Sequence, residues 1–239
     1  MHWNIGRFNF PIPCFEELRR AVFIFKRRLS EITWNSLAVF EESPASLQQT
    51  QAVLSGRAVA QLNAHDLRQI KNYGEGAKEL VRLLSDDAFD LSEGCACAIH
   101  RRVGCGEALQ WGVLRDLDLG IHGVDYRPPH HEELGRLARE GFAYLKSEIA
   151  DPRERAVALF LFMARSQFFF DANKRTASLM MNGCLMQSGY GPIGVLNRDS
   201  EEFHKRLGRF YETGNADPMM EFFETCARQI YSEQETALQ

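Results

Sequence analysis

The stretch QFFFDANKRT, residues 167–176, decides the fold because it separates the two most apolar helical segments of the chain. Before it, Asp151 and Pro152 provide an N-cap and a first-turn proline, and residues 156–164 are apolar on every side of a helix. After it, residues 176–187 carry apolar side chains at helical spacing. We therefore predict two buried helices joined by a tight turn.

The polar residues of this turn lie where the second helix begins: Asp171, Asn173, Lys174 and Arg175. A helix N-terminus offers unpaired N–H groups and a partial positive charge, and a Lys and an Arg add to that charge. Polar groups between buried helices are costly unless something pairs with them. The turn therefore predicts a binding site for an anion.

The same stretch resembles the signature of Fic/Doc proteins, H-x-F-x-[D/E]-[G/A]-N-[G/K]-R-x-x-R. It departs from the signature at two positions. Gln167 replaces the first His, which is the general base of the family, and Ser178 replaces the final Arg, which in many members clasps nucleotide phosphates. The matching residues are Phe169, Asp171, Ala172, Asn173, Lys174 and Arg175.

The resemblance implies a mainly α fold, a Fic-type helical bundle with a small β-hairpin flap and an N-terminal helical extension. We expect residues 1–75 to form the N-terminal helical region and residues 76–232 the Fic core domain. Around the two central helices, periodicity and capping residues predict further helices, with Gly74 and Gly76 weakening or bending the chain between two of them. These helices are expected at residues 14–32, 43–54, 63–71, 77–84, 92–103, 132–149, 200–211 and 217–229.

In an active member of the family, nucleotide phosphates lie over the start of the second signature helix. The resemblance therefore implies that Ala172, Asn173, Lys174 and Arg175 bind the phosphates of ATP or another nucleoside triphosphate, and that Asp171 holds Mg²⁺. Gln167 has no protonation equilibrium near neutral pH, and loss of a general base typically costs ~10²–10⁴-fold in rate. The expected function is that of a relative of the protein AMP transferases (protein adenylyltransferases) with impaired catalysis.

Two other functions stay open. Lys174 and the missing second Arg favour a Doc-like protein phosphotransferase, whereas chain length and the N-terminal region favour AMP transfer. The other alternative is a non-enzymatic module that binds or regulates a protein partner. A replacement base would have to come from a histidine near the flap or the helix before it: His100, His122, His130 or His131.

Between residues 107 and 129 the period changes. Residues 116–119 alternate polar and apolar side chains, and Gly120 and Gly123 provide turn positions, so we predict a short hairpin. In the family this region is the flap, which holds the target segment by strand addition. The resemblance assigns flap and target-binding roles to Gly112, Arg115, Leu117 and Leu119.

The segment before residue 43 is similar to the inhibitory motif of some Fic proteins, [S/T]-x-x-x-E-[G/N], whose Glu pairs with the second Arg of the signature. The best register places Glu41 at the Glu, with Leu37 at the Ser/Thr position and Glu42 at the Gly/Asn position. Because Ser178 replaces that Arg, we expect Glu41 to lack its cation partner and to be uncoupled from the pocket.

Composition limits the other possibilities. A chain of 239 residues with 45% hydrophobic and 25% charged residues predicts a soluble globular protein with one domain and an extension. With a net charge of −4 and a longest basic run at residues 26–28, we expect no nucleic-acid partner. No segment reaches the ~18 apolar residues that span a bilayer, so we expect no membrane and a cytoplasmic location. A protein substrate or partner is expected, and a homo-oligomer stays open.

Six cysteines in such a chain are expected to be free thiols. Cys95, Cys97, His100 and Cys105 form a local group, but C-x-C is not the usual spacing of a zinc site. Small buried thiols are the better interpretation of this group.

Overall fold

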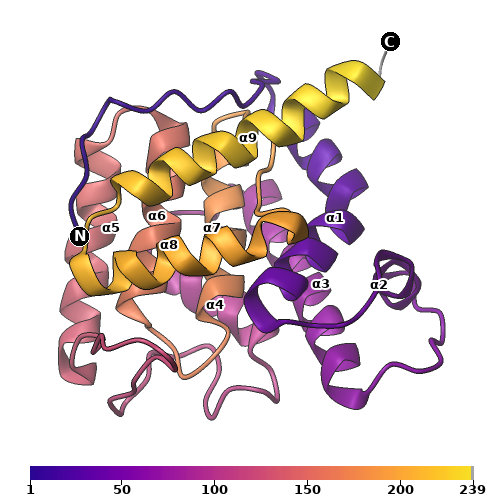
Figure 1. Cartoon of the computed structure of the whole chain (residues 1–239), viewed down its shortest axis with the longest axis horizontal. Coiled ribbons are helices and arrows are strands. Elements are labelled where there is room, and N and C mark those ends of the chain that lie inside the picture. Colours follow the sequence, from indigo (N-terminus) through magenta and orange to yellow (C-terminus); the bar gives the residue numbers. More distant parts are fainter. Residues whose placement is uncertain (238–239) are drawn as a thin grey trace.

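The computed structural model describes residues 1–237, with side chains described up to residue 232. Helices account for most of this part of the chain, and the two termini of the described fold lie on the same broad face as α8 and α9 (Figure 1). The helices are α1 (Leu18–Glu41), α2 (Leu47–Leu54), α3 (Ala64–Ser85), α4 (Glu93–Val103), η1 (His131–Glu133), α5 (Leu134–Glu148), α6 (Pro152–Ser166), α7 (Asn173–Gln187), η2 (Asn197–Asp199), α8 (Ser200–Thr213) and α9 (Asp217–Ala237).

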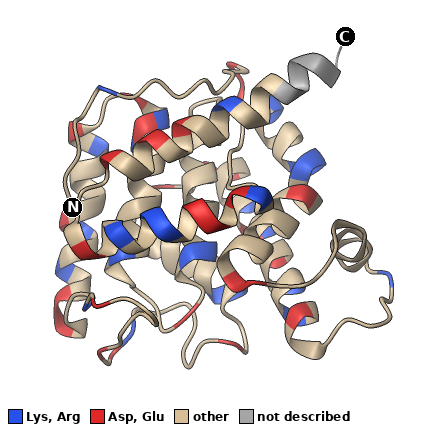
Figure 2. Cartoon of the chain, viewed as in Figure 1, with Lys and Arg blue, Asp and Glu red and all other residues tan. Residues whose placement is uncertain are grey.

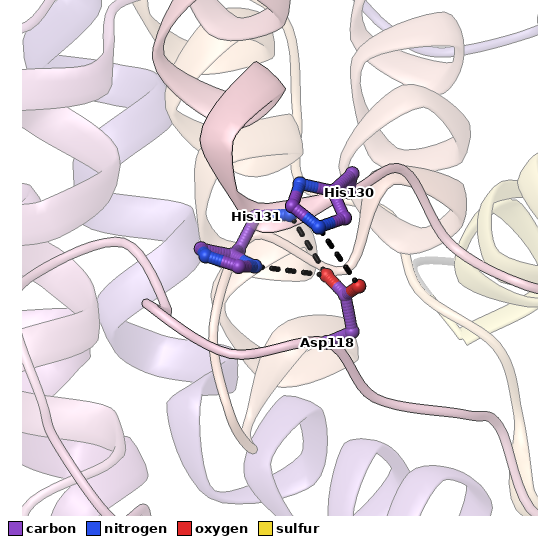
Figure 3. Close-up of side chains that lie close together, drawn as sticks. All are labelled: Asp118, His130 and His131. Carbon is purple, nitrogen blue, oxygen red and sulfur yellow. Dashed lines mark hydrogen bonds and ion pairs between the residues drawn. The ribbon is translucent and has the colours of Figure 1, made fainter.

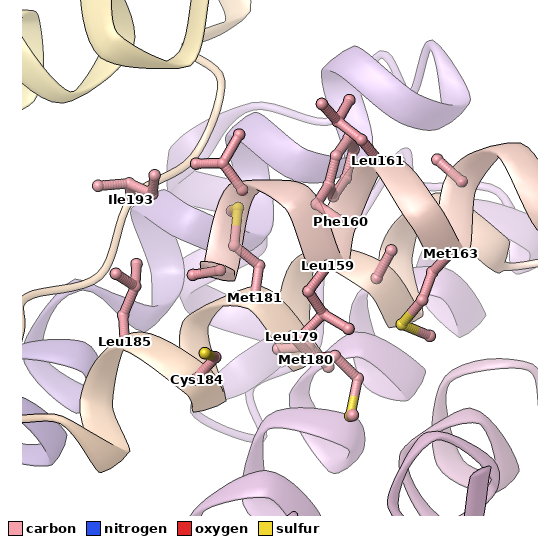
Figure 4. Close-up of a cluster of buried hydrophobic side chains, with 14 of the residues drawn as sticks. Leu159, Phe160, Leu161, Met163, Leu179, Met180, Met181, Cys184, Leu185 and Ile193 are labelled. Atoms are coloured by element: carbon pink, nitrogen blue, oxygen red, sulfur yellow. The ribbon is translucent and has the colours of Figure 1, made fainter. Parts of the chain in front are cut away.

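The helices α6 and α7 form the centre of the core, as predicted from the sequence. The Asp151 side chain caps α6 by accepting a hydrogen bond from the Arg153 backbone N–H at 2.8 Å, and Pro152 occupies the first turn. Residues 156–161 of α6 and residues 175–186 of α7 are buried around the whole helix circumference. Figure 4 shows side chains of both helices interdigitating in this core. The all-round apolar pattern therefore correctly indicated buried helices.

The remaining helices cover this pair. α1, α3 and α4 pack against α7, α5 packs against α6, and α8 and α9 cross in front of α6 and α7 in Figure 1. The N-terminal segment runs across the bundle and buries Phe8 and Phe10, and Trp3 Nε1 donates a 2.8 Å hydrogen bond to Glu154. The N-terminal segment is therefore anchored to the bundle by its aromatic side chains.

Two helices are longer than the sequence suggested. α1 continues to Glu41, and α3 runs unbroken through Gly74 and Gly76. A Cβ on Gly76 would lie 2.4 Å from Val103 Cγ2, so this glycine permits close helix packing instead of ending the helix. The predicted bend was wrong for this reason. The boundary predicted between residues 75 and 76 falls inside α3.

The predicted β-hairpin flap is not present, because the described residues between 104 and 130 contain no strand. The buried Arg115 guanidinium accounts for this difference. It donates hydrogen bonds to the carbonyl oxygens of Leu117 and Pro129, which join the two arms of the loop without a ladder of backbone pairs. Pro128 and Pro129 also lack the N–H groups that a ladder needs.

Charged residues of both signs are interspersed over the described helices (Figure 2). Among these helices, none is both long enough and apolar enough to pass through a membrane. All six cysteines are free, as expected. The expectation of buried thiols in the group near His100 holds for Cys95, whereas Cys97 is only partly buried and Cys105 is exposed.

Close packing around α7 generates a stability prediction. A Cβ on Gly183 would lie 2.4 Å from Phe89 Cζ and 2.7 Å from Leu80 Cδ1. We expect Gly183→Ala to lower the free energy of unfolding by about 1–3 kcal/mol in urea titrations, because overpacking outweighs the better helix propensity of Ala. Gly208→Ala is the control, since no atom lies within 4 Å of that Cβ. Equal stabilisation by both substitutions would contradict the packing argument.

Candidate functional site

The turn between α6 and α7 is built on the side chain of Asn173. Its Oδ1 accepts a hydrogen bond from the Phe169 backbone N–H at 2.9 Å, and its Nδ2 donates to the Phe169 carbonyl oxygen at 2.7 Å. Gln167 and Ala172 both adopt left-handed backbone conformations, with φ of 47° and 57°. The chain therefore reverses sharply and presents the first turn of α7, where N–H groups lack partners within the helix.

Gln167 lies at the C-terminal end of α6, and its amide is engaged on both sides. Its Nε2 donates to the Ala164 carbonyl oxygen at 2.7 Å, and its Oε1 accepts from Asn173 Nδ2 at 3.0 Å. Burial raises the pKa of the Tyr211 phenol, and a hydrogen bond between Gln167 and Tyr211 partly opposes this increase. Gln167 thus lies where the resemblance places the base, held as a neutral amide.

A cavity of about 450 Å³ opens at the start of α7, beside the loop at residues 120–124. It brings together five predicted site residues, Gln167 and residues 171–174, with Glu41 at the end of α1. Such a volume is in the usual range for small-molecule sites. Its walls are Glu41, Gly120, Ile121, His122, Gly123, Val124, Gln167, Phe170, Asp171, Ala172, Asn173, Lys174, His204, Leu207, Gly208 and Tyr211.

Arg175 does not line this cavity. Its side chain is fully buried, with its Nη1 2.9 Å from Glu107 Oε2 and its Nε 2.8 Å from Glu41 Oε1. Asp171 Oδ1 lies farther away, 3.7 Å from Nη2. The role of Arg175 in phosphate binding stays a prediction, and in this structure two carboxylates occupy the space around its guanidinium.

The expectation that Glu41 lacks a cation partner is wrong, because Glu41 pairs with Arg175. Arg175 Nε and Nη2 make no well-aligned hydrogen bond among the described residues, so the contact with Glu41 is chiefly coulombic. Burial raises the pKa of Glu41, and Arg175 partly opposes this increase. Burial lowers the pKa of Arg175, but the charges of Glu41 and Glu107 more than offset it, and the net direction is upward.

Ser178 stands where the resemblance calls for the second Arg. Its hydroxyl lies 3.5 Å from the hydroxyl of Tyr73, which in turn lies 3.1 Å from Ser36 Oγ. All three side chains are buried. Neutral hydroxyl groups therefore fill the space expected for the second Arg. The cation that faces Glu41 is Arg175, which lies one helical turn earlier in α7.

Of the two carboxylates in the cavity wall, Asp171 is the one that could hold a metal ion, because Glu41 is already paired with Arg175. Its side chain is half exposed, and its Oδ1 accepts a hydrogen bond from the Ala172 backbone N–H, which fixes the carboxylate at the cavity wall. Mg²⁺ is usually held by one or two carboxylates together with water and substrate phosphates. A single carboxylate in the wall of a cavity of this size fits this pattern.

Of the four predicted flap residues, Arg115 is buried and acts from inside the loop. Besides its bonds to Leu117 and Pro129, its Nε donates to the Gln167 carbonyl oxygen at 2.7 Å. Gly112 is buried with φ of 78°, and a Cβ there would lie 2.7 Å from Arg101 Nε. Leu117 is exposed and Leu119 partly exposed, so only these two can meet a partner directly.

The sequence analysis considered His100 only as a replacement base or a member of the cysteine group, and it did not predict the contact between Glu107 and Arg175. His100 is fully buried and its ring stacks on Phe169, with ring centres 3.8 Å apart. Its Nδ1 accepts from the Gly112 N–H at 3.0 Å, so its Nε2 carries the proton and donates to the Asp171 carbonyl oxygen at 3.1 Å. A buried His between a loop glycine and the signature turn orders both segments and cannot serve as a free base.

Four more histidines lie at the cavity or at the loop beside it, and they divide into two groups. His122, on the flap, and His204, on α8, line the cavity. His130 and His131 instead contact Asp118. His204 was missed because helical spacing alone does not show which face of α8 meets the cavity.

The fold and cavity together define the class of protein: a helical bundle with a cavity at the turn between its two central helices. It is similar to the structure of Fic-1 (residues 134–508) from C. elegans, with a TM-score of 0.77 and 22% identity over 92% of this chain and 69% of that one. A Fic family protein from Desulfovibrio desulfuricans G20 gives a TM-score of 0.71 at 19% identity, with 92% and 73% of the two chains covered.

Sequence comparison agrees with the fold. A "Protein adenylyltransferase Fic" from Nematostella vectensis is 23% identical over 219 residues, 90% of this chain and 49% of that protein. The chain spans about half or less of the length of the curated relatives it matches. The model of a protein family described as "Fic/DOC family" matches residues 90–185 of this chain.

The burial of His100 predicts an acid-dependent loss of stability. Burial lowers the pKa of His100 from 6.5 to about 4, although the bond to Asp171 opposes this shift. The unfolded chain therefore binds the proton first, and stability is lost as the pH falls from about 6.5 to about 4. The shift corresponds to roughly 3 kcal/mol.

We expect denaturant unfolding at several pH values to show this loss in the wild type and in His65→Gln, which alters an exposed histidine. His100→Gln keeps a neutral donor and acceptor and should lack the corresponding part of the pH dependence. The same slope in all three proteins would contradict the assignment.

Proposed function

We propose that the cavity binds a nucleoside triphosphate such as ATP, with its phosphates over the first turn of α7. The observation that carries this proposal is the cavity of about 450 Å³ at that helix start, with Lys174 and Asp171 in its walls. Free N–H groups, the helix dipole and Lys174 would hold phosphate oxygens. Asp171 would hold Mg²⁺, which neutralises phosphate charge when it is bound.

The proposed activity is transfer of AMP to a hydroxyl group of a target protein, as the name of the Nematostella vectensis relative indicates for that protein. In this chain we propose that transfer is impaired, because the amide of Gln167 stands beside the cavity at the position of the base. An amide cannot accept the hydroxyl proton, so the attack on phosphorus lacks the usual ~10²–10⁴-fold assistance.

Glu41 supports a further part of this proposal, namely that the site is restrained by a carboxylate of its own chain. Glu41 lines the cavity together with Lys174 and pairs with Arg175. A phosphate over α7 would meet this negative charge at short range, and like charges in a poorly solvated site repel strongly. Glu41 would therefore weaken nucleotide binding.

Exposed apolar side chains favour the second candidate function, a protein-binding module. Leu109, Trp111, Val113 and Leu117 are 70%, 43%, 45% and 57% exposed. The first three alternate along one segment and project large apolar groups into solvent. Aromatic and aliphatic groups of this kind often anchor a protein partner. The same surface could hold the target of an active transferase.

The contact between Glu41 and Arg175 predicts the result of a binding experiment. We expect Glu41→Gly and Glu41→Gln to bind Mg·ATP about 10-fold more tightly than the wild type in calorimetric titrations, a gain of about 1.4 kcal/mol, because the competing carboxylate is removed. Glu42→Gly is the matched control, since Glu42 is exposed and does not line the cavity. Unchanged affinity in both Glu41 variants would show that Glu41 does not restrain the site.

The missing base predicts the result of a transfer experiment. Gln167→His should raise labelling of a target protein by a factor on the order of 10² or more, because an imidazole titrates near neutral pH. The backbone favours this substitution, since His is among the residues tolerated at positive φ. α-labelled and γ-labelled ATP separate AMP transfer from phosphate transfer.

Equal labelling by wild type and Gln167→His would contradict impaired catalysis, and His122→Gln and His204→Gln would then identify a base in the cavity wall. If both proteins bind nucleotide and neither labels a target, the protein-binding module becomes the better description.

A further inference from the structure

A group of side chains of the types that bind metals lies outside the cavity. It is at the base of the loop between Leu117 and Pro129, which keeps the name flap although it contains no strand. Asp118 comes from the first arm of the loop, and His130 and His131 from the end of the second arm (Figure 3). Their ligand atoms all lie within 4.8 Å of one another. We propose that this group binds a divalent transition metal ion, for which Zn²⁺ is the probe, and that the ion clamps the two arms of the flap together.

The geometry is close to what such an ion requires. Asp118 Oδ2 lies 3.2 Å from His130 Nε2, and Asp118 Oδ1 lies 3.0 Å from His131 Nδ1. Ligands of a tetrahedral Zn²⁺ at ~2.0–2.1 Å are about 3.3 Å apart. Small rotations of the imidazoles therefore suffice to convert these two contacts with Asp118 into metal contacts. Two imidazoles and one carboxylate are a ligand set that Zn²⁺ uses, with the fourth position left to water.

Metal binding also requires that each imidazole move the proton that now faces Asp118. Each imidazole that points an N–H at Asp118 must present a bare nitrogen to the metal, and a neutral imidazole does so by moving its proton to its other nitrogen. The other nitrogen of His130, Nδ1, accepts the Glu132 backbone N–H at 3.4 Å and lies 3.8 Å from a Glu132 carboxylate oxygen. The ring would give up the long contact with the backbone N–H and donate its Nδ1–H to the carboxylate. A carboxylate behind a metal-bound His commonly orients the ring.

The surrounding charges leave the group open to a cation. The Asp118 carboxylate accepts the backbone N–H of His131 at 2.9 Å and presents its negative charge at the surface. Arg115 Nη1 lies 3.5 Å from Asp118 and opposes a cation, but the same nitrogen is engaged by the Leu117 carbonyl oxygen. The Asp118 and His130 side chains are 56% and 49% exposed, so an ion can reach them from solvent.

A metal here would act on the cavity through the loop that it closes. Residues 120–124 lie between Asp118 and the two histidines along the chain, and they form one wall of the cavity. An ion that joins both ends of this loop reduces the number of conformations available to its tip. The flap wall would therefore become more rigid without any metal entering the cavity.

The test is a Zn²⁺ titration by calorimetry on tag-free protein in which the exposed thiols are removed by Cys14→Ser and Cys105→Ser. We expect one saturable site, with affinity lowered on the order of 10-fold or more by Asp118→Asn or His131→Asn. His65→Asn is the matched control, because it removes an exposed histidine on α3. Equal affinity in the control and the Asp118 variant, or no binding by the parent protein, would overturn the proposal.

A second measurement guards against variants that fail to fold. Hydrogen exchange of residues 116–131 in the unaltered flap should slow when Zn²⁺ is added and recover when a chelator removes it. Exchange in α9, far along the chain, should not change. Slowing that is absent, or that spreads evenly over the chain, would show that Zn²⁺ does not clamp the flap.

Discussion

The buried guanidinium of Arg175 is the constraint on which the site depends. A fully buried charge is costly unless oppositely charged groups surround it, and removal of one partner from such a group is strongly destabilising. Glu107 and Glu41 provide the two close carboxylates from the segment after α4 and from the last residue of α1. The ends of elements far apart in the sequence are thereby held at the first turn of α7, where the cavity opens.

Two other buried polar side chains extend this arrangement into the loops. His100 bonds to the backbone of Gly112 and Asp171, and Arg115 bonds to the backbone of Gln167 and to both arms of the flap. Each side chain satisfies backbone groups that regular secondary structure would otherwise pair. The signature turn and the flap are therefore ordered by side chains from neighbouring segments, and a substitution at either residue would disturb both at once.

Much of the helical fold could be predicted from the sequence because local signals coincided with burial. The Asp151 and Pro152 start of α6, the Ser92 cap of α4 and the apolar surface of α7 all depend on residues close together in the chain. The flap could not be predicted in this way. Its alternating pattern resembles a strand, but the conformation is decided by a buried Arg that bonds to residues distant in sequence.

The pairing of Glu41 shows the same limit for the site. A motif comparison assigns the carboxylate one specific partner, and when that partner was replaced by Ser178 the contact was expected to be lost. In three dimensions another cation was available, because α7 presents Arg175 to the end of α1. Residue types at matching positions could be read from the sequence, whereas the choice between neighbouring partners depended on packing.

The closed base of the flap has a consequence for how this region can vary. Since Arg115 fixes both ends, the residues between Leu117 and Pro129 form a compact loop whose ends are anchored independently of its tip. The entropy of closing a loop rises slowly with length, by only about 0.6 kcal/mol for each doubling. Insertions or deletions at the tip would therefore reshape one wall of the cavity at small cost to folding, which separates the evolution of ligand choice from that of the helical core.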